Sequence, residues 1–155
     1  MSDAKEHQQA FGLHRPAQAF HYDIYEGDFL TMSRELIRWQ RKDHFWNVSL
    51  LDESNYGGKE LTGTALFVYG MAWGVRNELL NPDIYRPIVI DTWNAMVKQC
   101  LRKDGFLHYV QGTGKEPKDS QPVGRNREPD FDDFGLGCFL LAGSEVYQLV
   151  AHVEP

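Results

Sequence analysis

The chain has 155 residues, enough for one domain or a piece of a larger one, and is 42% hydrophobic and 13% aromatic with a formal net charge of −6. The acidic balance argues against a nucleic-acid partner, since phosphate binding needs a basic face. Its two cysteines form no metal-binding or disulfide pattern, and the N-terminus lacks the apolar core of a signal peptide. No apolar run approaches the roughly 18 residues of a membrane span. We therefore expect a cytoplasmic protein without a membrane partner.

The N-terminal third of the chain predicts one helix between two irregular segments. Residues 1–25 have weak periodicity and predict an irregular leader. Residues 26–42 predict a helix with one polar side, because Phe29, Met32, Leu36 and Trp39 follow one another at helical spacing. Residues 44–51 alternate loosely and predict a short extended segment, and residues 52–59 have the glycine and polar content of a loop.

Two further helices are predicted in the middle of the chain. Residues 61–77 are apolar on every side, which predicts a helix buried on all faces and capped by Thr62 or Thr64. Asn81 and Pro82 are typical of a helix start, although Pro87 allows the regular helix to begin later. The apolar positions after Pro87 predict one buried face.

The C-terminal part of the chain repeats this alternation. A turn at Asp104 and Gly105 leads to a predicted short strand at 106–110 and a long polar loop at 112–130, followed by a second all-round apolar helix at 134–150. Cys100 and Cys138 lie in apolar runs and are interpreted as small core residues. The sequence predicts an all-α fold of about four main helices with a short β-hairpin or extended segments. Polar-sided and fully apolar helices in alternation favour either a two-layer helical toroid or an ordinary helical bundle.

Several separate motifs resemble one known enzyme family. In chain order they are WNVSLLD at 46–52, ELTGTALFVYGMAWG at 60–74, Asp104-Gly105, Val110-Gln111 with Gly114 and Pro117, and FGLGCFLLAGSEV at 134–146. Together they resemble glycoside hydrolase family 105, the unsaturated rhamnogalacturonyl and glucuronyl hydrolases, which is related to family 88. The resemblance covers residues 25–149 and assigns 26–155 to the C-terminal part of the family's domain.

The resemblance implies an (α/α)6 barrel that releases unsaturated uronic acids from oligosaccharides made by polysaccharide lyases. In the family an aspartate protonates the ring double bond, water adds to the adjacent carbon, and the product opens; no metal or cofactor is implied. This chain has about four of the twelve helices, and the family's catalytic aspartate and Trp-x-Arg-x-x-x-Trp stretch have no counterpart in it. The catalytic residue is therefore unknown, and we expect the chain alone to be inactive.

Two functional readings follow from that mismatch. In the first, the chain is part of an unsaturated-uronide hydrolase whose missing N-terminal part supplies the acid. In the second, it is a truncated, non-catalytic helical domain that binds a sugar or associates through exposed inner helices, for example as a homodimer.

The resemblance also selects residues for the sugar site. Inner helices of such a barrel point their N-termini at the pocket, and a helix N-terminus attracts a carboxylate. We therefore expect Glu60, Thr62, Thr64 and Asp133 to line the floor of the pocket, with helix capping alone as the alternative interpretation for Thr62, Thr64 and Asp133.

Aromatic and acidic residues near these positions have two interpretations each. Trp46 and Tyr56 flank the loop leading to Glu60, where each is suited to stack on a sugar ring or to pack in the core. The carboxylates at 130, 132 and 133 lack the distant Glu ligand of a calcium loop, so no metal site is expected.

Overall fold

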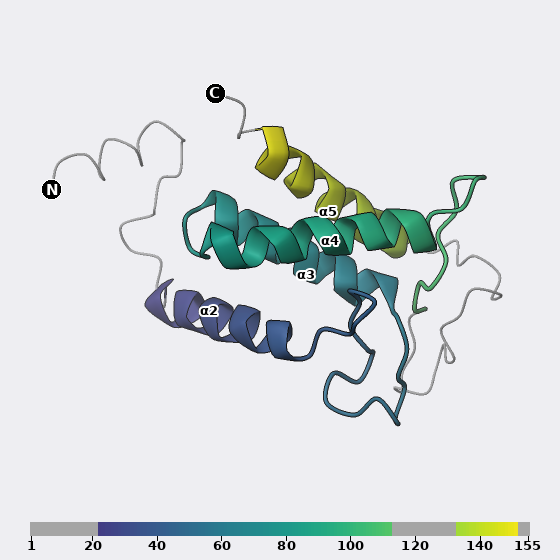
Figure 1. The fold of residues 1–155 in the computed structure, drawn as a ribbon, viewed down its shortest axis with the longest axis horizontal. Coiled ribbons are helices and arrows are strands. Elements are labelled where there is room, and N and C mark those ends of the chain that lie inside the picture. The colour runs from purple at the N-terminus through teal and green to yellow at the C-terminus, as the bar shows by residue number, and fades with distance from the viewer. Residues whose placement is uncertain (1–21, 113–132, 152–155) are drawn as a thin grey trace, which may run out of the picture. The chain divides into compact units, whose positions relative to one another are not determined.

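Helices joined by irregular loops make up the part of the chain that the structure describes. The computed structural model describes residues 22–112 and 133–151. They form four helices: α2 (Tyr22–Arg38), α3 (Leu61–Arg76), α4 (Pro82–Cys100) and α5 (Asp133–Ala151) (Figure 1). The predicted all-α class and the order of the helices are confirmed. The leader and the 112–130 loop fall almost wholly outside the described residues.

The chain divides into two units, residues 1–32 and 33–155, and α2 passes from the first into the second. The helix starts and ends four residues earlier than the 26–42 range predicted from its apolar stripe. Leu36 of that stripe is buried, but Trp39 lies beyond the helix in a turn closed by a hydrogen bond from its N–H to the carbonyl of Leu36 (3.2 Å) and is 41% exposed.

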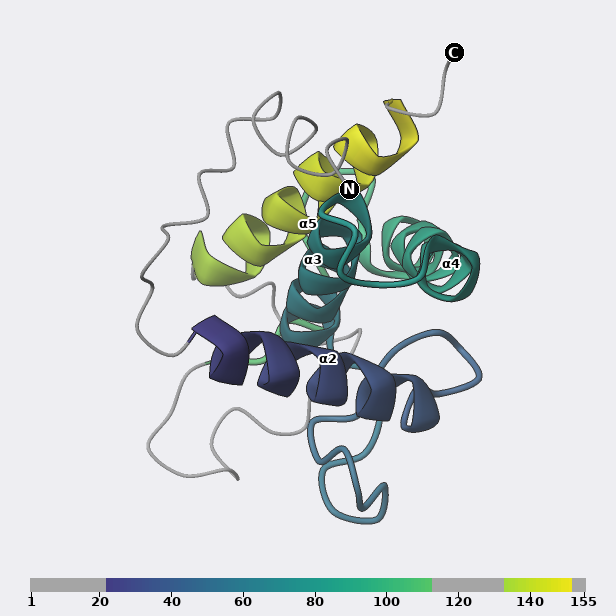
Figure 2. The ribbon, with the colours of Figure 1, turned by 90° about the vertical axis from the view of Figure 1, so that its left-hand side faces the viewer.

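The second unit is built around α3, which lies between α4 and α5 (Figure 2). The short connection between Arg76 and Pro82 makes α3 and α4 an antiparallel pair, and α5 packs on the other side of α3. Close packing of α4 and α5 depends on Gly143, since a Cβ there would lie 2.7 Å from the ring of Trp93. That ring stacks on Phe139 with a centroid distance of 4.8 Å.

The starts of the central helices differ in part from the sequence signals. Asn81 caps α4 as predicted, accepting a hydrogen bond from the Asp83 N–H at 2.9 Å, and the helix begins at Pro82 and continues through Pro87. The predicted threonine cap of α3 is wrong, because the capping residue is Glu60.

The connections bring distant segments to the N-terminus of α3. The predicted extended segment and strand appear only as isolated antiparallel bridges, Trp46 with Glu60 and Leu101 with Leu107, rather than as a hairpin. The predicted turn is confirmed, with Gly105 at φ +87°. After that turn the chain returns to α3, where the Leu61 N–H donates to the Tyr109 carbonyl at 2.9 Å.

The expectation that α3 and α5 are buried on every side is wrong. Trp73 on α3 is 37% exposed, although it lies in the 61–77 range that is predicted to be buried on all faces. The exposed stripe of α5 consists of Leu136, Leu140, Leu141, Tyr147 and Val150, each at least 47% exposed. The face of α5 opposite this stripe is buried, so the helix is covered on one side only.

Burial and composition of α4 and α5 bear on two sequence interpretations. Residues Phe134–Ala151 are long and apolar enough to cross a membrane by length and composition, but core helices of soluble proteins pass the same test. Cys100 is fully buried, as predicted, and burial raises the pKa of its thiol to about 12. Cys138 is only half-buried.

Candidate functional site

The N-terminus of α3 is capped by a buried carboxylate of the same chain. Glu60 is 5% exposed and accepts hydrogen bonds from the N–H groups of Thr62 at 2.6 Å and Gly63 at 2.7 Å. The Thr62 hydroxyl also donates to it, and the Gln111 N–H reaches it at 3.4 Å. The carboxylate of Glu60 thus already fills the anion site that a helix N-terminus provides.

A cavity of about 280 Å³ lies at this helix end. That volume is close to the lower end of ligand pockets, which are about 300–1,000 Å³, so it suits one small ring. Polar groups of the first turn of α3 share its wall with apolar side chains, in the mixture expected of a ligand site. The lining residues are Trp46, Asn47, Val48, Leu50, Glu60, Thr62, Gly63, Thr64, Phe67 and Gln111.

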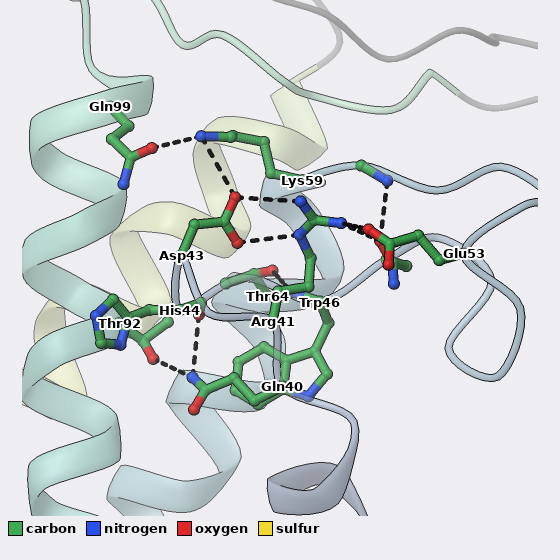
Figure 3. Close-up of polar contacts among 12 residues, drawn as sticks. Gln40, Arg41, Asp43, His44, Trp46, Glu53, Lys59, Thr64, Thr92 and Gln99 are labelled. Atoms are coloured by element: carbon green, nitrogen blue, oxygen red, sulfur yellow. Dashed lines mark hydrogen bonds and ion pairs between the residues drawn. The ribbon is translucent and has the colours of Figure 1, made fainter.

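The loop between α2 and α3 forms one wall of this cavity, and Arg41 holds it in place (Figure 3). Its guanidinium donates to Asp43 at 3.0 and 3.4 Å, to the Asn47 Oδ1 at 2.6 Å and to Glu53 at 2.6 Å. The Asn47 Oδ1 accepts a second hydrogen bond from the Gly58 N–H at 2.9 Å. The Arg41 side chain therefore links separate parts of this irregular loop, which fixes the shape of the cavity wall without a β-sheet.

A second set of contacts joins this loop to α4. Lys59 donates to Gln99, forms an ion pair with Asp43 at 3.6 Å, and lies over the rings of Phe45 and Tyr109 at 5.2 and 5.3 Å. Figure 3 shows Asp43 between Arg41 and Lys59. Burial works to raise the pKa of Asp43, but the hydrogen bonds and charge of Arg41, with the charge of Lys59, hold it below its ordinary value.

Glutamine and threonine side chains add a neutral contact to the same junction. Gln40 donates to the Thr92 hydroxyl at 2.8 Å and to the His44 carbonyl at 3.0 Å. Thr92 is fully buried on α4, so this bond anchors the start of the loop against the helix.

Only some of the site residues predicted from the sequence line the cavity. Glu60, Thr62 and Thr64 line the cavity together, and the Thr64 hydroxyl accepts a hydrogen bond from the Trp46 N–H at 3.2 Å. Tyr56 is half-buried, has φ +59° and is not among the lining residues. Asp133 begins α5, and its side chain lies outside the described part of the structure.

Trp46 has the role of a core residue. It is 1% exposed, its indole N–H donates to the Leu36 carbonyl at 2.8 Å, and its ring meets Phe67 edge-on at a centroid distance of 5.3 Å. The ring is thus packed within the chain, but Trp46 also lines the cavity, so stacking on a sugar ring stays a prediction.

Sequence reasoning missed several residues of the cavity. Asn47, Val48 and Leu50 belong to the first family-like motif and Gln111 to a later one, but neither motif showed which side chains face a common space. Phe67, interpreted only as part of a buried helix, also lines the cavity. Within the described residues, no group of three or more His, Cys, Asp or Glu side chains is arranged to hold a metal ion.

Comparison with solved structures identifies the architecture. A glycosyl hydrolase family 88 structure from Bacteroides vulgatus superposes with a TM-score of 0.76 at 38% identity, covering 87% of this chain and 38% of that one. A polysaccharide lyase superposes with a TM-score of 0.78 at 31% identity, covering 91% of this chain and 39% of that one. The helices therefore form part of the helical toroid of this family.

Comparison with curated proteins gives the same result. An unsaturated 3S-rhamnoglycuronyl hydrolase of Formosa agariphila is 36% identical over 129 residues, which are 83% of this chain and 32% of that protein. This chain thus spans about a third of the length of the relative. The model of glycosyl hydrolase family 88 matches residues 15–150. The chain belongs to glycosyl hydrolase family 88, the relative of the family 105 named from its motifs.

Proposed function

We propose that this chain is part of an unsaturated-glycuronyl hydrolase, and that the cavity at the N-terminus of α3 holds the sugar from which the unsaturated uronic acid is released. The observation that carries the proposal is the buried carboxylate of Glu60, which lines the cavity beside the hydroxyl-bearing Thr62 and Thr64. Carboxylate and hydroxyl oxygens are the acceptors that sugar hydroxyl groups need.

The surroundings of Glu60 explain how it can serve as such an acceptor. Its backbone N–H donors fix the carboxylate in place, so a ligand hydroxyl meets an acceptor that needs no reorganisation. The Glu60 Oε1 already accepts from Thr62 and Gln111, but Oε2 accepts only from the Gly63 N–H among the contacts of the described residues, which leaves one of its two lone-pair sites for a ligand hydroxyl. Phe67 supplies apolar surface against which a ring carbon skeleton can pack.

The protonating group belongs to another part of the barrel in this proposal. Glu60 is engaged as the cap of α3, and no described carboxylate besides it lines the cavity. Loss of a positioned proton donor costs about 10²–10⁴-fold in rate. We therefore propose that the chain binds an unsaturated disaccharide but turns it over slowly or not at all.

Calorimetry tests this proposal with an unsaturated uronyl disaccharide and its saturated counterpart, while loss of the ultraviolet absorbance of the conjugated double bond reports turnover. The expected result is binding of the unsaturated sugar, weakened by Glu60→Gln, with little loss of absorbance. No binding of either sugar contradicts the proposal. Robust turnover abolished by changing an aspartate of this chain contradicts the assignment of the acid to another part.

The exposed stripe of α5 favours a second candidate function, association without catalysis. An apolar helix face left in water usually marks an interface. Because α5 packs on α3 with its opposite face, the exposed stripe is available to a second copy of this chain. In that case the chain is a self-associating helical domain, and the cavity at α3 is a remnant without a substrate.

A further inference from the structure

The cavity at the N-terminus of α3 has a charge of one sign only. Among the described residues that line it, Glu60 is charged and the others are neutral polar or apolar. We propose that the cavity selects an uncharged sugar, which donates one hydroxyl to the Glu60 Oε2, and that the carboxylate repels a sugar carrying a sulfate or carboxylate there. The inference rests on the proposed function, because it names the class of sugar that this cavity holds next to the unsaturated uronide.

The hydrogen bonds of Glu60 fix its carboxylate without neutralising it. They come from Thr62, Gly63 and Gln111, which are all neutral donors. The helix N-terminus contributes a partial charge of roughly +0.5, which is less than the full negative charge of the carboxylate. Because Glu60 is 5% exposed, water and salt screen this charge weakly. A second anion in the cavity would therefore be repelled.

Arg41 and Lys59, the cations that hold the loop beside the cavity, are used by other carboxylates. Arg41 pairs with Asp43 at 3.0 Å and with Glu53 at 2.6 Å. Lys59 pairs with Asp43 at 3.6 Å and donates to Gln99. Neither cation is among the residues that line the cavity. A sulfate or carboxylate on the sugar thus has no described cation there to offset its repulsion by Glu60.

Gly63 keeps the accepting oxygen open to a ligand. It lines the cavity in the first turn of α3, and its N–H donates to the Glu60 Oε2 at 2.7 Å. A Cβ at this position would lie 3.1 Å from the same oxygen and would crowd its remaining lone-pair site. Glycine is less favourable than alanine in a helix, and the access that it gives to Glu60 accounts for its presence in this turn.

The rest of the wall suits an uncharged sugar ring. Val48, Leu50 and Phe67 supply apolar surface, and Asn47 and Gln111 add neutral amide groups. A pocket of this kind binds its ligand through apolar contacts and a few hydrogen bonds. None of these contacts requires a charge on the sugar, so the discrimination against charge comes from the Glu60 carboxylate.

The test compares disaccharides that share the same unsaturated uronide and differ only at the neighbouring sugar. That sugar is unmodified, sulfated at one hydroxyl or acetylated at the same hydroxyl, and each free hydroxyl is modified in turn. The acetyl group adds bulk without charge, so it separates repulsion from fit. Calorimetry on the full chain measures the dissociation constants. At one hydroxyl or more, we expect the sulfated sugar to bind about 10- to 100-fold more weakly than the acetylated one.

Glu60→Gln tests the role of the charge. It removes the negative charge and keeps an oxygen that can accept from the N–H groups of α3. We expect it to narrow the difference between the sulfated and acetylated sugars by about tenfold. The matched control is Asp91→Asn, which removes an exposed carboxylate of α4 and is expected to change that difference by no more than about twofold.

Gly63→Ala tests the open oxygen without a change of charge. We expect it to weaken binding of the unmodified sugar by about tenfold, because the added methyl group obstructs the hydrogen bond to Glu60. Gly137→Ala adds the same group to α5, where no atom of the described residues lies within 4 Å of it, and is expected to change binding by no more than about twofold. Thermal unfolding establishes that each variant is folded. If Glu60→Gln does not fold, the sugar comparison on the unchanged chain and Gly63→Ala decide.

Each outcome has a separate meaning. Sulfated sugars that bind as tightly as the acetylated ones at every hydroxyl, or a difference that Glu60→Gln leaves intact, overturn the inference while the proposed function stands. Equal effects of Gly63→Ala and Gly137→Ala overturn the hydrogen bond to the Glu60 Oε2. Failure of the unchanged chain to bind any of these disaccharides overturns the inference together with the proposed function.

Discussion

At the scale of single residues, Glu60 combines two roles that are usually separate. As the cap of α3 it satisfies the N–H groups of Thr62 and Gly63, and as a lining residue it faces the cavity. The sequence favoured Thr62 or Thr64 as this cap, because Ser, Thr, Asp and Asn dominate helix caps. The longer glutamate side chain reaches the same N–H groups here because its backbone is held extended by the bridge to Trp46.

We predict that Glu60→Ala destabilises the fold by about 2–3 kcal/mol, because it leaves buried N–H donors of α3 without their charged acceptor. Urea unfolding at neutral pH measures this as a lower midpoint with an unchanged slope. The control is Asn81→Ala, which removes the exposed cap of α4 and is expected to cost about 1 kcal/mol. Equal losses in the two variants would show that burial of the Glu60 carboxylate adds nothing.

Asp43 gives the fold an acid-sensitive contact. Its pKa in the folded state lies below the ordinary value of 3.8, so its ion pairs stabilise the fold above about pH 4 and lose that effect as the pH falls through the folded pKa. We predict that Asp43→Asn lowers stability at pH 7 and flattens its decline below pH 4. The Arg102 hydrogen bonds, which lower the pKa of Asp104, leave part of the decline in place.

Thermal unfolding between pH 7 and pH 2.5 measures this dependence. Asp91→Asn removes an exposed carboxylate of α4 and serves as the matched control. If the Asp43 and Asp91 variants lose stability in parallel with the unchanged chain, the Arg41–Asp43–Lys59 contacts do not contribute as described.

At the scale of elements, the apolar pattern of the sequence predicted where the helices begin and end better than it predicted how far they are buried. The 61–77 and 134–150 ranges agree with α3 and α5 within one residue at each end, since long apolar runs with clear polar flanks define helices well. The predicted 26–42 range is displaced from α2 because Trp39 has helical spacing in the sequence yet lies in a turn. What ends α2 there is the loop held by Arg41 and Gln40, whose partners reach as far along the chain as Thr92.

The cavity was predictable only where its residues share one segment. Glu60, Thr62 and Thr64 were found because the start of a buried helix is a local signal. Gln111 lies 51 residues from Glu60 in sequence, and no local pattern reports their contact. Asn47 was quoted within a motif, but its importance depends on two hydrogen bonds that only the folded loop provides.

Two glycines of α5 test the packing of this element. Alanine normally stabilises a helix by up to about 1 kcal/mol relative to glycine, and at Gly137 no atom lies within 4 Å of the added Cβ. We therefore predict that Gly137→Ala is stabilising. Gly143→Ala places the same methyl group 2.7 Å from the Trp93 ring and is predicted to cost about 1–3 kcal/mol.

Urea unfolding of the two alanine variants checks this difference, with each serving as the control of the other. A stabilised Gly143→Ala variant would show that α4 and α5 are not packed as closely as the Trp93 contact indicates.

At the scale of the whole molecule, the exposed stripe of α5 predicts self-association. Burying about 400 Å² of apolar surface favours association by about 10 kcal/mol before the entropic costs of association are subtracted. We predict that the chain self-associates and that Leu140→Glu, on the stripe, shifts it toward monomer.

Light scattering at several concentrations measures the association. The matched control is Leu51→Glu, which places the same charge on an exposed leucine of the loop and is expected to leave association unchanged. A chain that stays monomeric at every concentration, or equal effects of the two variants, would contradict an interface on α5.

The proposed function depends on a sugar site at the N-terminus of α3. The most direct measurement is a nuclear magnetic resonance titration of the isotope-labelled chain with an unsaturated uronyl disaccharide, following the amide signals. We predict saturable shifts concentrated at residues 46–50 and 60–64 and at Gln111, with signals of the exposed stripe of α5 unchanged. Shifts confined to other parts of the chain, or no shifts at all, would contradict it.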